Sequence, residues 1–75
     1  MIEVFKTNVK TKKQAQQLAR LLNENFGYDN INFDLDDSDK ILRIKAPEIL
    51  SCDVVGVLKR EHFECEVLPD KPALT

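Results

Sequence analysis

Segments in which every second residue is apolar are interspersed with segments in which apolar residues recur at helical spacing. The order of these segments restricts the fold of the 75-residue chain most strongly. Residues 2–9 alternate, which predicts a strand with Phe5, Thr7 and Val9 on one side. A helix follows, with Thr11 and Gln14 at the spacing of a capping box and Gly27 as its stop. Its apolar stripe consists of Ala15, Leu18, Ala19, Leu22 and Phe26.

The middle of the chain has the pattern of a β-hairpin. Residues 30–35 alternate strictly, and residues 40–46 resume the alternation with Leu42 and Ile44 on one face. The intervening segment is rich in short polar side chains, which favour turns. Its carboxylates do not have the spacing of a calcium loop of the EF-hand type, which needs glycine at the sixth position. These carboxylates are Asp34, Asp36, Asp37 and Asp39.

A second helix and a last strand complete the pattern. Ser51 is expected to cap the helix, and Asp53 lies in its first turn. The buried stripe is predicted to be Val54, Val55 and Leu58. Gly56 lowers helix propensity, so we expect another segment to pack closely against it. Residues 63–68 alternate again, and their inward side chains are predicted to be Phe63, Cys65 and Val67.

The resulting order, β-α-β-β-α-β, predicts an α+β fold of the ferredoxin-like type. Two β-α-β halves with right-handed crossovers give a four-stranded antiparallel sheet with both helices on one face. We expect residues 1–68 to form this domain and residues 69–75, which include two prolines, to be a flexible tail.

Composition excludes several classes of function. A net charge of −2 gives no overall attraction to nucleic acid or to a membrane surface, and no apolar run is long enough to span a bilayer. Glu3 and Lys6 interrupt the segment where a signal peptide would be apolar, so a cytoplasmic protein is expected. No nucleophile stands beside a base, so no enzymatic activity is predicted.

The hydrophobic spacing resembles that of the heavy-metal-associated domains, the copper-chaperone-like family. Its motif, Met-x-Cys-x-x-Cys, falls here on Val9 and, for the two cysteines, on Thr11 and Gln14. The apolar positions that follow fall on Leu18, Leu21 and Leu22. The resemblance implies the same fold and partner contacts around this loop. A hydroxyl and an amide cannot replace two thiolates for a soft ion such as Cu(I), so no metal or other cofactor is expected.

The sequence therefore predicts a binding or regulatory module that acts through protein contacts, including self-association. The alternative is a carrier with an unconventional site. One candidate is an anion or acidic-partner surface formed by Lys10, Thr11, Lys12, Lys13 and Gln14. The other is a thiol site at Cys52, alone or with His62. The lysines and the Asp-rich turn are expected to place opposite charges on different surfaces.

Overall fold

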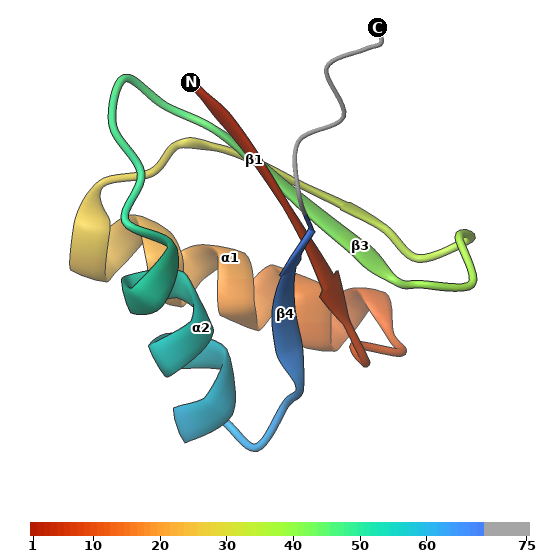
Figure 1. Ribbon diagram of the computed structural model, residues 1–75. Helices are drawn as coiled ribbons and strands as arrows, with labels where there is room; N and C mark the ends of the chain where they lie inside the picture. The colour runs from red at the N-terminus through yellow and green to blue at the C-terminus, as the bar shows by residue number, and fades with distance from the viewer. Residues whose placement is uncertain (69–75) are drawn as a thin grey trace, which may run out of the picture.

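The computed structural model describes residues 1–68 as a four-stranded antiparallel sheet with two helices packed on one of its faces (Figure 1). The strand order is β2-β3-β1-β4, which confirms the ferredoxin-like α+β fold. The elements are β1 (Ile2–Thr7), α1 (Lys12–Phe26), β2 (Asn30–Asp34), β3 (Ile41–Lys45), α2 (Ser51–Arg60) and β4 (Cys65–Leu68). The predicted tail, residues 69–75, lies outside the described residues.

Helix α1 begins and ends where local sequence signals predict. Thr11 is the N-cap in an extended conformation, and the reciprocal hydrogen bonds of a capping box with Gln14 are both present. Gly27 ends the helix with φ of 77°, and its backbone N–H donates to the carbonyl of Asn23 at 2.7 Å. A left-handed conformation of this kind is favourable for glycine because glycine has no Cβ.

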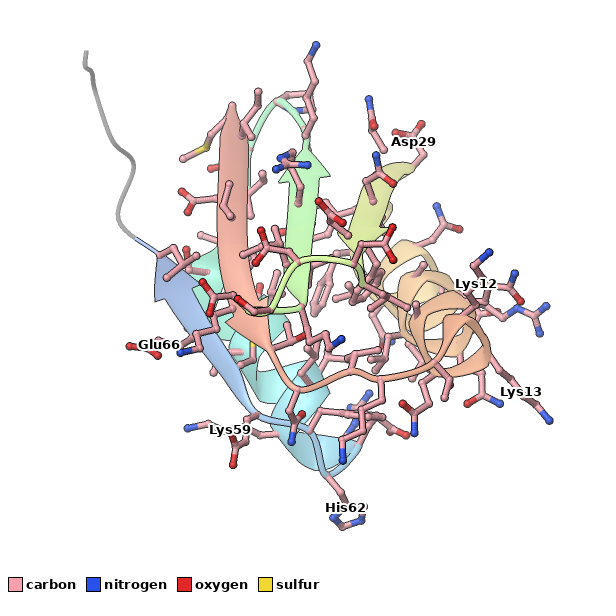
Figure 2. All side chains as sticks on the ribbon, turned by 90° about the vertical axis from the view of Figure 1, so that its right-hand side faces the viewer. Lys12, Lys13, Asp29, Lys59, His62 and Glu66 are labelled. Carbon is pink, nitrogen blue, oxygen red and sulfur yellow. The ribbon has the colours of Figure 1, made fainter. Side chains whose placement is uncertain are left out.

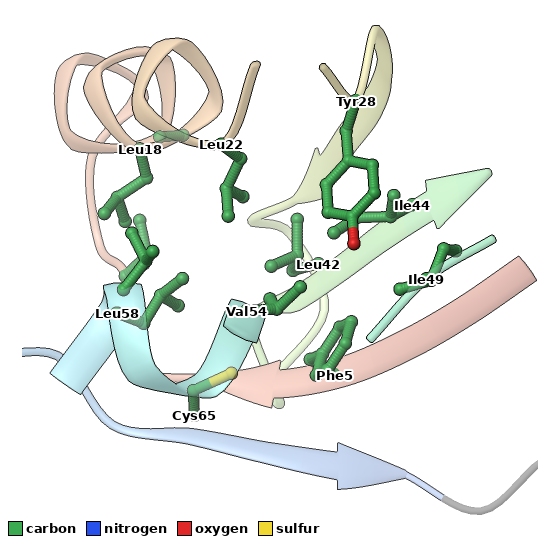
Figure 3. Close-up of a cluster of buried hydrophobic side chains, with 13 residues drawn as sticks. Phe5, Leu18, Leu22, Tyr28, Leu42, Ile44, Ile49, Val54, Leu58 and Cys65 are labelled. Carbon is green, nitrogen blue, oxygen red and sulfur yellow. The ribbon is translucent and has the colours of Figure 1, made fainter. Parts of the chain in front are cut away.

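The core lies between the sheet and the two helices (Figure 3). Phe5 on the central strand β1 lies opposite Leu42 on β3 and Val67 on β4, and Phe5 is fully buried. Val9 is also fully buried although it follows the end of β1. Tyr28 and Ile49 belong to the core as well, although both lie outside the periodic segments and the sequence pattern did not identify them. The largest fully buried side chains are Phe5, Leu18, Leu22, Leu42, Ile44, Leu58, Val9 and Val54.

Three predictions about α2 are wrong. Ser51 is the first helical residue, and Leu50 is the N-cap without a side-chain cap bond. The third buried position of the helix is Val57, whereas Val55 is only partly buried. Within residues 1–68, no segment packs closely on Gly56, because a Cβ added there would meet nothing within 4 Å. Close packing therefore does not explain the glycine at this position.

The two edge strands are less covered than strict alternation predicts. Val67 has its partner Phe5 on the core face, yet it remains 38 % exposed because β4 has a neighbour on one side only in the described sheet. On the opposite edge, Ile31 and Phe33 are only partly buried. In residues 1–68, no helix is long and apolar enough to span a bilayer.

Candidate functional site

The β1–α1 loop, residues 8–11, is held in place by its own capping box. The backbone N–H of Gln14 donates to Oγ1 of Thr11 at 3.1 Å. In return, Oε1 of Gln14 accepts hydrogen bonds from the N–H groups of Thr11 at 3.3 Å and Lys10 at 3.1 Å. Both side chains at the ligand positions of the resembling family are therefore occupied by local backbone contacts.

Thr7, at the end of β1, anchors this loop to the rest of the molecule. Its buried hydroxyl donates to the carbonyl of Lys40 at 2.6 Å and accepts from the N–H of Val9 at 3.2 Å. The N–H of Thr7 donates in turn to the carbonyl of Asp39 at 3.2 Å. These contacts link the loop to the turn between β2 and β3. Alternation predicts that Thr7 points inward, but its positioning role depends on residues 32 or more positions away.

A second contact fixes the loop to the residue that precedes β4. Oδ1 of Asn8 accepts a hydrogen bond from the N–H of Glu64 at 2.8 Å. The β1–α1 loop is thus held between the β2–β3 turn and the α2–β4 connection, all at one end of the sheet. No local pattern in the sequence indicates this role for Asn8, because its partner is 56 residues away.

The expectation that lysines and aspartates occupy different surfaces is wrong. Nζ of Lys6 lies 3.7 Å from Oδ1 of Asp39, with both side chains about half exposed. Lys12 lines a hollow that Asp34 and Asp36 also line. A half-exposed ion pair contributes at most ~1 kcal/mol, so the Lys6–Asp39 pair mainly neutralises charge locally. Lysines and aspartates therefore share this end of the molecule, which weakens its attraction for a free anion.

The thiol candidates lie apart. Cys52 is exposed in the first turn of α2, whereas His62 follows the last turn, so ten helical residues and about 15 Å separate the two ends. Figure 2 shows His62 projecting into solvent at the bottom of the view, apart from Lys12 and Lys13, which project from α1 on the right. One ion cannot contact both Cys52 and His62 of a single chain, so the paired site is wrong. A thiol site at Cys52 alone, which is exposed, stays a prediction.

Cys65 is a core residue. Its side chain lies on the helix-facing side of β4, and burial raises the pKa of its thiol from 9.0 to about 11, an effect that the nearby Lys59 charge partly opposes. A thiol that stays protonated is a poor metal ligand and a poor nucleophile. Cys65 therefore serves packing, as its alternation with neighbouring residues predicts.

The side chains that could hold a metal ion are dispersed over the part of the chain that the structure describes. Among residues 1–68, no three His, Cys, Asp or Glu side chains come together as ligands. The positions of the resembling family's cysteines offer one hydroxyl and one amide, and neither is the thiolate that a soft ion prefers.

An open hollow lies beside the β1–α1 loop, between α1 and the edge strand β2. Its volume is about 370 Å³. Its walls are mainly apolar, with one lysine and two aspartates at the end nearest the β2–β3 turn. The lining residues are Lys12, Ala15, Gln16, Ala19, Ile31, Phe33, Asp34, Leu35 and Asp36. We call this the α1–β2 groove.

Comparison with known proteins supports the fold. No protein-family model and no curated protein sequence matches this chain. Among solved structures, the chain is similar to the yeast copper transporter domain CCC2A, whose solution structure was determined in apo and Cu(I)-loaded states. The TM-score is 0.78 at 11 % sequence identity, over 93 % of this chain and 97 % of that chain. This chain therefore has the fold of a copper transporter domain.

Proposed function

We propose that this chain is a non-enzymatic binding module that acts through protein–protein contacts and carries no metal at the β1–α1 loop. The observation that carries the proposal is the capping box of Thr11 and Gln14. In a fold shared with a domain studied with Cu(I), the two positions that the resembling family uses for thiolates hold side chains that bind the protein's own backbone.

Two further features support a role in protein contacts. The loop is fixed on both sides, by Thr7 and by Asn8, so it presents a preformed surface. A preformed surface loses little conformational entropy on binding. The adjacent α1–β2 groove adds apolar area beside β2, an edge strand with no second strand partner among residues 1–68.

Metal titration tests the proposal. Purified protein titrated with Cu(I) and, separately, with Zn(II) under reducing conditions is expected to show no stoichiometric tight binding. The double variant Thr11→Cys/Gln14→Cys restores the thiolate pair on the same backbone and is expected to bind one Cu(I) per chain. This variant shows whether the scaffold or the residue types prevent binding.

The matched control places the same cysteine spacing at another exposed part of α1. The variant Gln17→Cys/Arg20→Cys has two thiols one helical turn apart in the middle of the helix, away from the N-terminal amides that help a thiol to ionise. It is expected to bind Cu(I) more weakly than the loop variant. One-equivalent binding by the wild-type protein that Cys52→Ser abolishes would overturn the proposal.

A further inference from the structure

We propose that the β2 edge binds an extended peptide segment of a partner protein, in which alternate apolar residues are flanked by basic residues. The segment adds a strand to the sheet and places its apolar side chains in the α1–β2 groove. This inference rests on the proposed function, because it gives the chemistry of a partner for a module that acts through protein contacts. The binding surface consists of β2, the carboxylates that flank it and the α1–β2 groove.

The backbone of β2 is able to bond to an added strand. Among residues 1–68, β2 pairs only with β3, in a regular antiparallel register from Asn30 to Asp34. In such a ladder, every second residue directs both its N–H and its C=O away from the neighbouring strand. The five residues of β2 contain neither lysine nor proline, which commonly protect an edge. An extended peptide can therefore pair with this strand by β-augmentation.

The α1–β2 groove accommodates side chains from one face of the added strand. Ile31 and Phe33 pack on the core but remain partly exposed, and both line the groove. On the helix side, Ala15 and Ala19 have small side chains that leave the groove open. Because successive side chains of a strand point to opposite faces, every second residue of the peptide faces the groove. Apolar side chains at those positions remove apolar surface from water.

Three carboxylates lie at the two ends of the edge. Asp29 directly precedes β2, Asp34 is its last residue, and Asp36 lies two positions further along the chain. All three are exposed, and none belongs to an ion pair formed within residues 1–68. Lys12 shares the α1–β2 groove with Asp34 and Asp36, so it offsets part of their charge. Figure 2 shows Asp29 at the start of β2, apart from Lys12. The edge therefore keeps a net negative charge.

The nearest other cations lie further from an added strand. Arg43 and Lys45 are exposed residues of β3, and they alternate with the buried Leu42 and Ile44, so they project from the face of the sheet without helices. Two strand spacings, about 10 Å, separate β3 from a strand added beside β2. This distance is close to the Debye length at physiological salt, so these cations act weakly on the added strand.

The carboxylates determine the charge of the partner. They disfavour an acidic segment, and they also disfavour β2 of a second copy, which carries the same carboxylates. A basic residue beside Asp34 and another beside Asp29 give two contacts of opposite charge. Asp29 and Asp34 are five positions apart, or about 17 Å in an extended strand. The two basic residues of the peptide are therefore expected to have the same separation.

The pattern of β2 defines a peptide that fits it. In antiparallel pairing, the hexapeptide Lys-Val-Thr-Ile-Thr-Lys aligns with residues 34 to 29 of this chain. Its two lysines then lie beside Asp34 and Asp29. Its valine and isoleucine lie beside Phe33 and Ile31, on the side of the groove. Cross-strand pairs of aromatic with β-branched side chains, and pairs of opposite charge, stabilise antiparallel strands.

NMR titration of the complete chain with this peptide, acetylated and amidated at its ends, tests the inference. Amide shift changes are expected to saturate and to centre on residues 29–36, with smaller changes at Ala15 and Ala19. Binding is expected to weaken as salt is raised, because salt screens contacts between exposed charges. The absence of saturable shift changes at β2 overturns the inference.

A second peptide with glutamate in place of both lysines tests the charge of the partner. It keeps the length and the apolar residues of the first peptide. We expect it to bind at least several-fold more weakly, because it places carboxylates beside Asp34 and Asp29. Equal binding of the two peptides overturns the inference.

The variant Asp34→Asn tests the same charge from the side of the protein. It is expected to weaken binding of the basic peptide several-fold, with little change in side-chain shape. The matched control is Glu66→Gln, which makes the same charge change at an exposed position of β4, the opposite edge strand. This control is expected to bind as the wild type does. Equal loss of binding in both variants overturns the inference.

The variant Ala19→Leu tests the groove. Its larger side chain occupies space that the apolar side chains of the peptide need, so binding of the basic peptide is expected to fall at least several-fold. The matched control is Gln17→Leu, which adds the same side chain at an exposed position of α1 that does not line the groove. Circular dichroism of both variants reports whether the fold is kept. A folded Ala19→Leu that binds as tightly as Gln17→Leu overturns the inference.

The two proposals fail by different measurements. Metal titration reports on the β1–α1 loop and does not depend on the peptide. Shift changes at β2 that follow protein concentration in the absence of peptide make a second copy the occupant of the edge. That result overturns the basic segment as partner but leaves a module that acts through protein contacts. Tight Cu(I) binding removes the proposed function whatever the peptide titration shows.

Discussion

Replacing Thr7 with valine tests whether this buried hydroxyl positions the β1–α1 loop. Valine has nearly the same shape as threonine but cannot form hydrogen bonds. The substitution removes the bond that Thr7 donates to the carbonyl of Lys40 at 2.6 Å and the bond that it accepts from the N–H of Val9 at 3.2 Å. The loop therefore loses its side-chain link to the β2–β3 turn while the packing volume stays almost unchanged.

The expected cost follows from the burial of these groups. A net hydrogen bond contributes about 1 kcal/mol, and a buried N–H left without an acceptor costs about 1–3 kcal/mol. Thr7 is only 6 % exposed and its bond with Val9 is buried, so water cannot readily replace the lost partner. We expect Thr7→Val to lower the free energy of unfolding by about 2–3 kcal/mol. This is a large share of the stability of a domain this size, roughly 3–10 kcal/mol.

Thr7→Ser is the matched control because it keeps Oγ1 and removes one methyl group. Its expected cost is about 0.8 kcal/mol, the contribution of one buried methylene-sized group. Urea unfolding followed by circular dichroism measures both values. In the same samples, amide chemical shifts of Val9 and Lys40 are expected to change more in Thr7→Val than in Thr7→Ser. If Thr7→Val proves as stable as Thr7→Ser, the hydroxyl does not have the role that we assign to it.

Three further predictions concern other parts of the chain. Gly56→Ala is expected to stabilise the protein by up to about 1 kcal/mol in urea unfolding, since a Cβ there meets no neighbour among the described residues. Gly27→Ala is expected to destabilise the protein because φ at this position is 77°. A stabilising Gly27→Ala with a destabilising Gly56→Ala would contradict these roles of the two glycines. Because the folded protein raises the pKa of Cys65 to about 11, this thiol contributes stability that is complete below pH 9 and is lost as the pH rises toward 11. Cys65→Ala is expected to show a shallower alkaline loss of stability, and an unchanged slope would count against burial as the cause. Phosphate titration is expected to leave the amide shifts of residues 10–14 unchanged in NMR spectra. The side chain of Gln14 already accepts hydrogen bonds from the N–H groups of Lys10 and Thr11, and nearby aspartates reduce the positive charge of the lysines. Shifts centred on residues 10–14 would support the anion surface.

Local sequence signals predict α1 well because every interaction that defines its ends is local. The capping box joins residues three or four positions apart, and the stop depends on one glycine with no side chain. The same signals fail at the start of α2. There, the N–H of Leu50 donates to the hydroxyl of Tyr28 at 3.2 Å, a contact across 22 residues that no local pattern encodes. The helix begins at Ser51, and its N-cap, Leu50, has no side-chain oxygen to form a cap bond.

The candidate site likewise has some properties that local sequence predicts and others that depend on residues distant in sequence. The residue types at the two ligand positions, Thr11 and Gln14, are sufficient to predict a capping box in place of a thiolate pair. The lysine-rich composition of the loop is equally visible. The charge that those lysines present to a ligand cannot be predicted from the loop alone. It depends on Asp34, Asp36 and Asp39, which β2 and β3 bring to the same end of the sheet. Thr7 and Asn8 are likewise recognised only through partners that are distant in sequence.

The sequence by itself determined the order of strands and helices, the packing faces of most of them and the absence of cysteines at the resembling family's ligand positions. These properties follow from side-chain period and from hydrogen bonds between close neighbours, and both depend on residue types and their spacing along the sequence. Only the tertiary structure decided which charges meet, how far Cys52 lies from His62 and which strand edge stays open. Those outcomes depend on strand order and register, and these join segments that the sequence keeps apart.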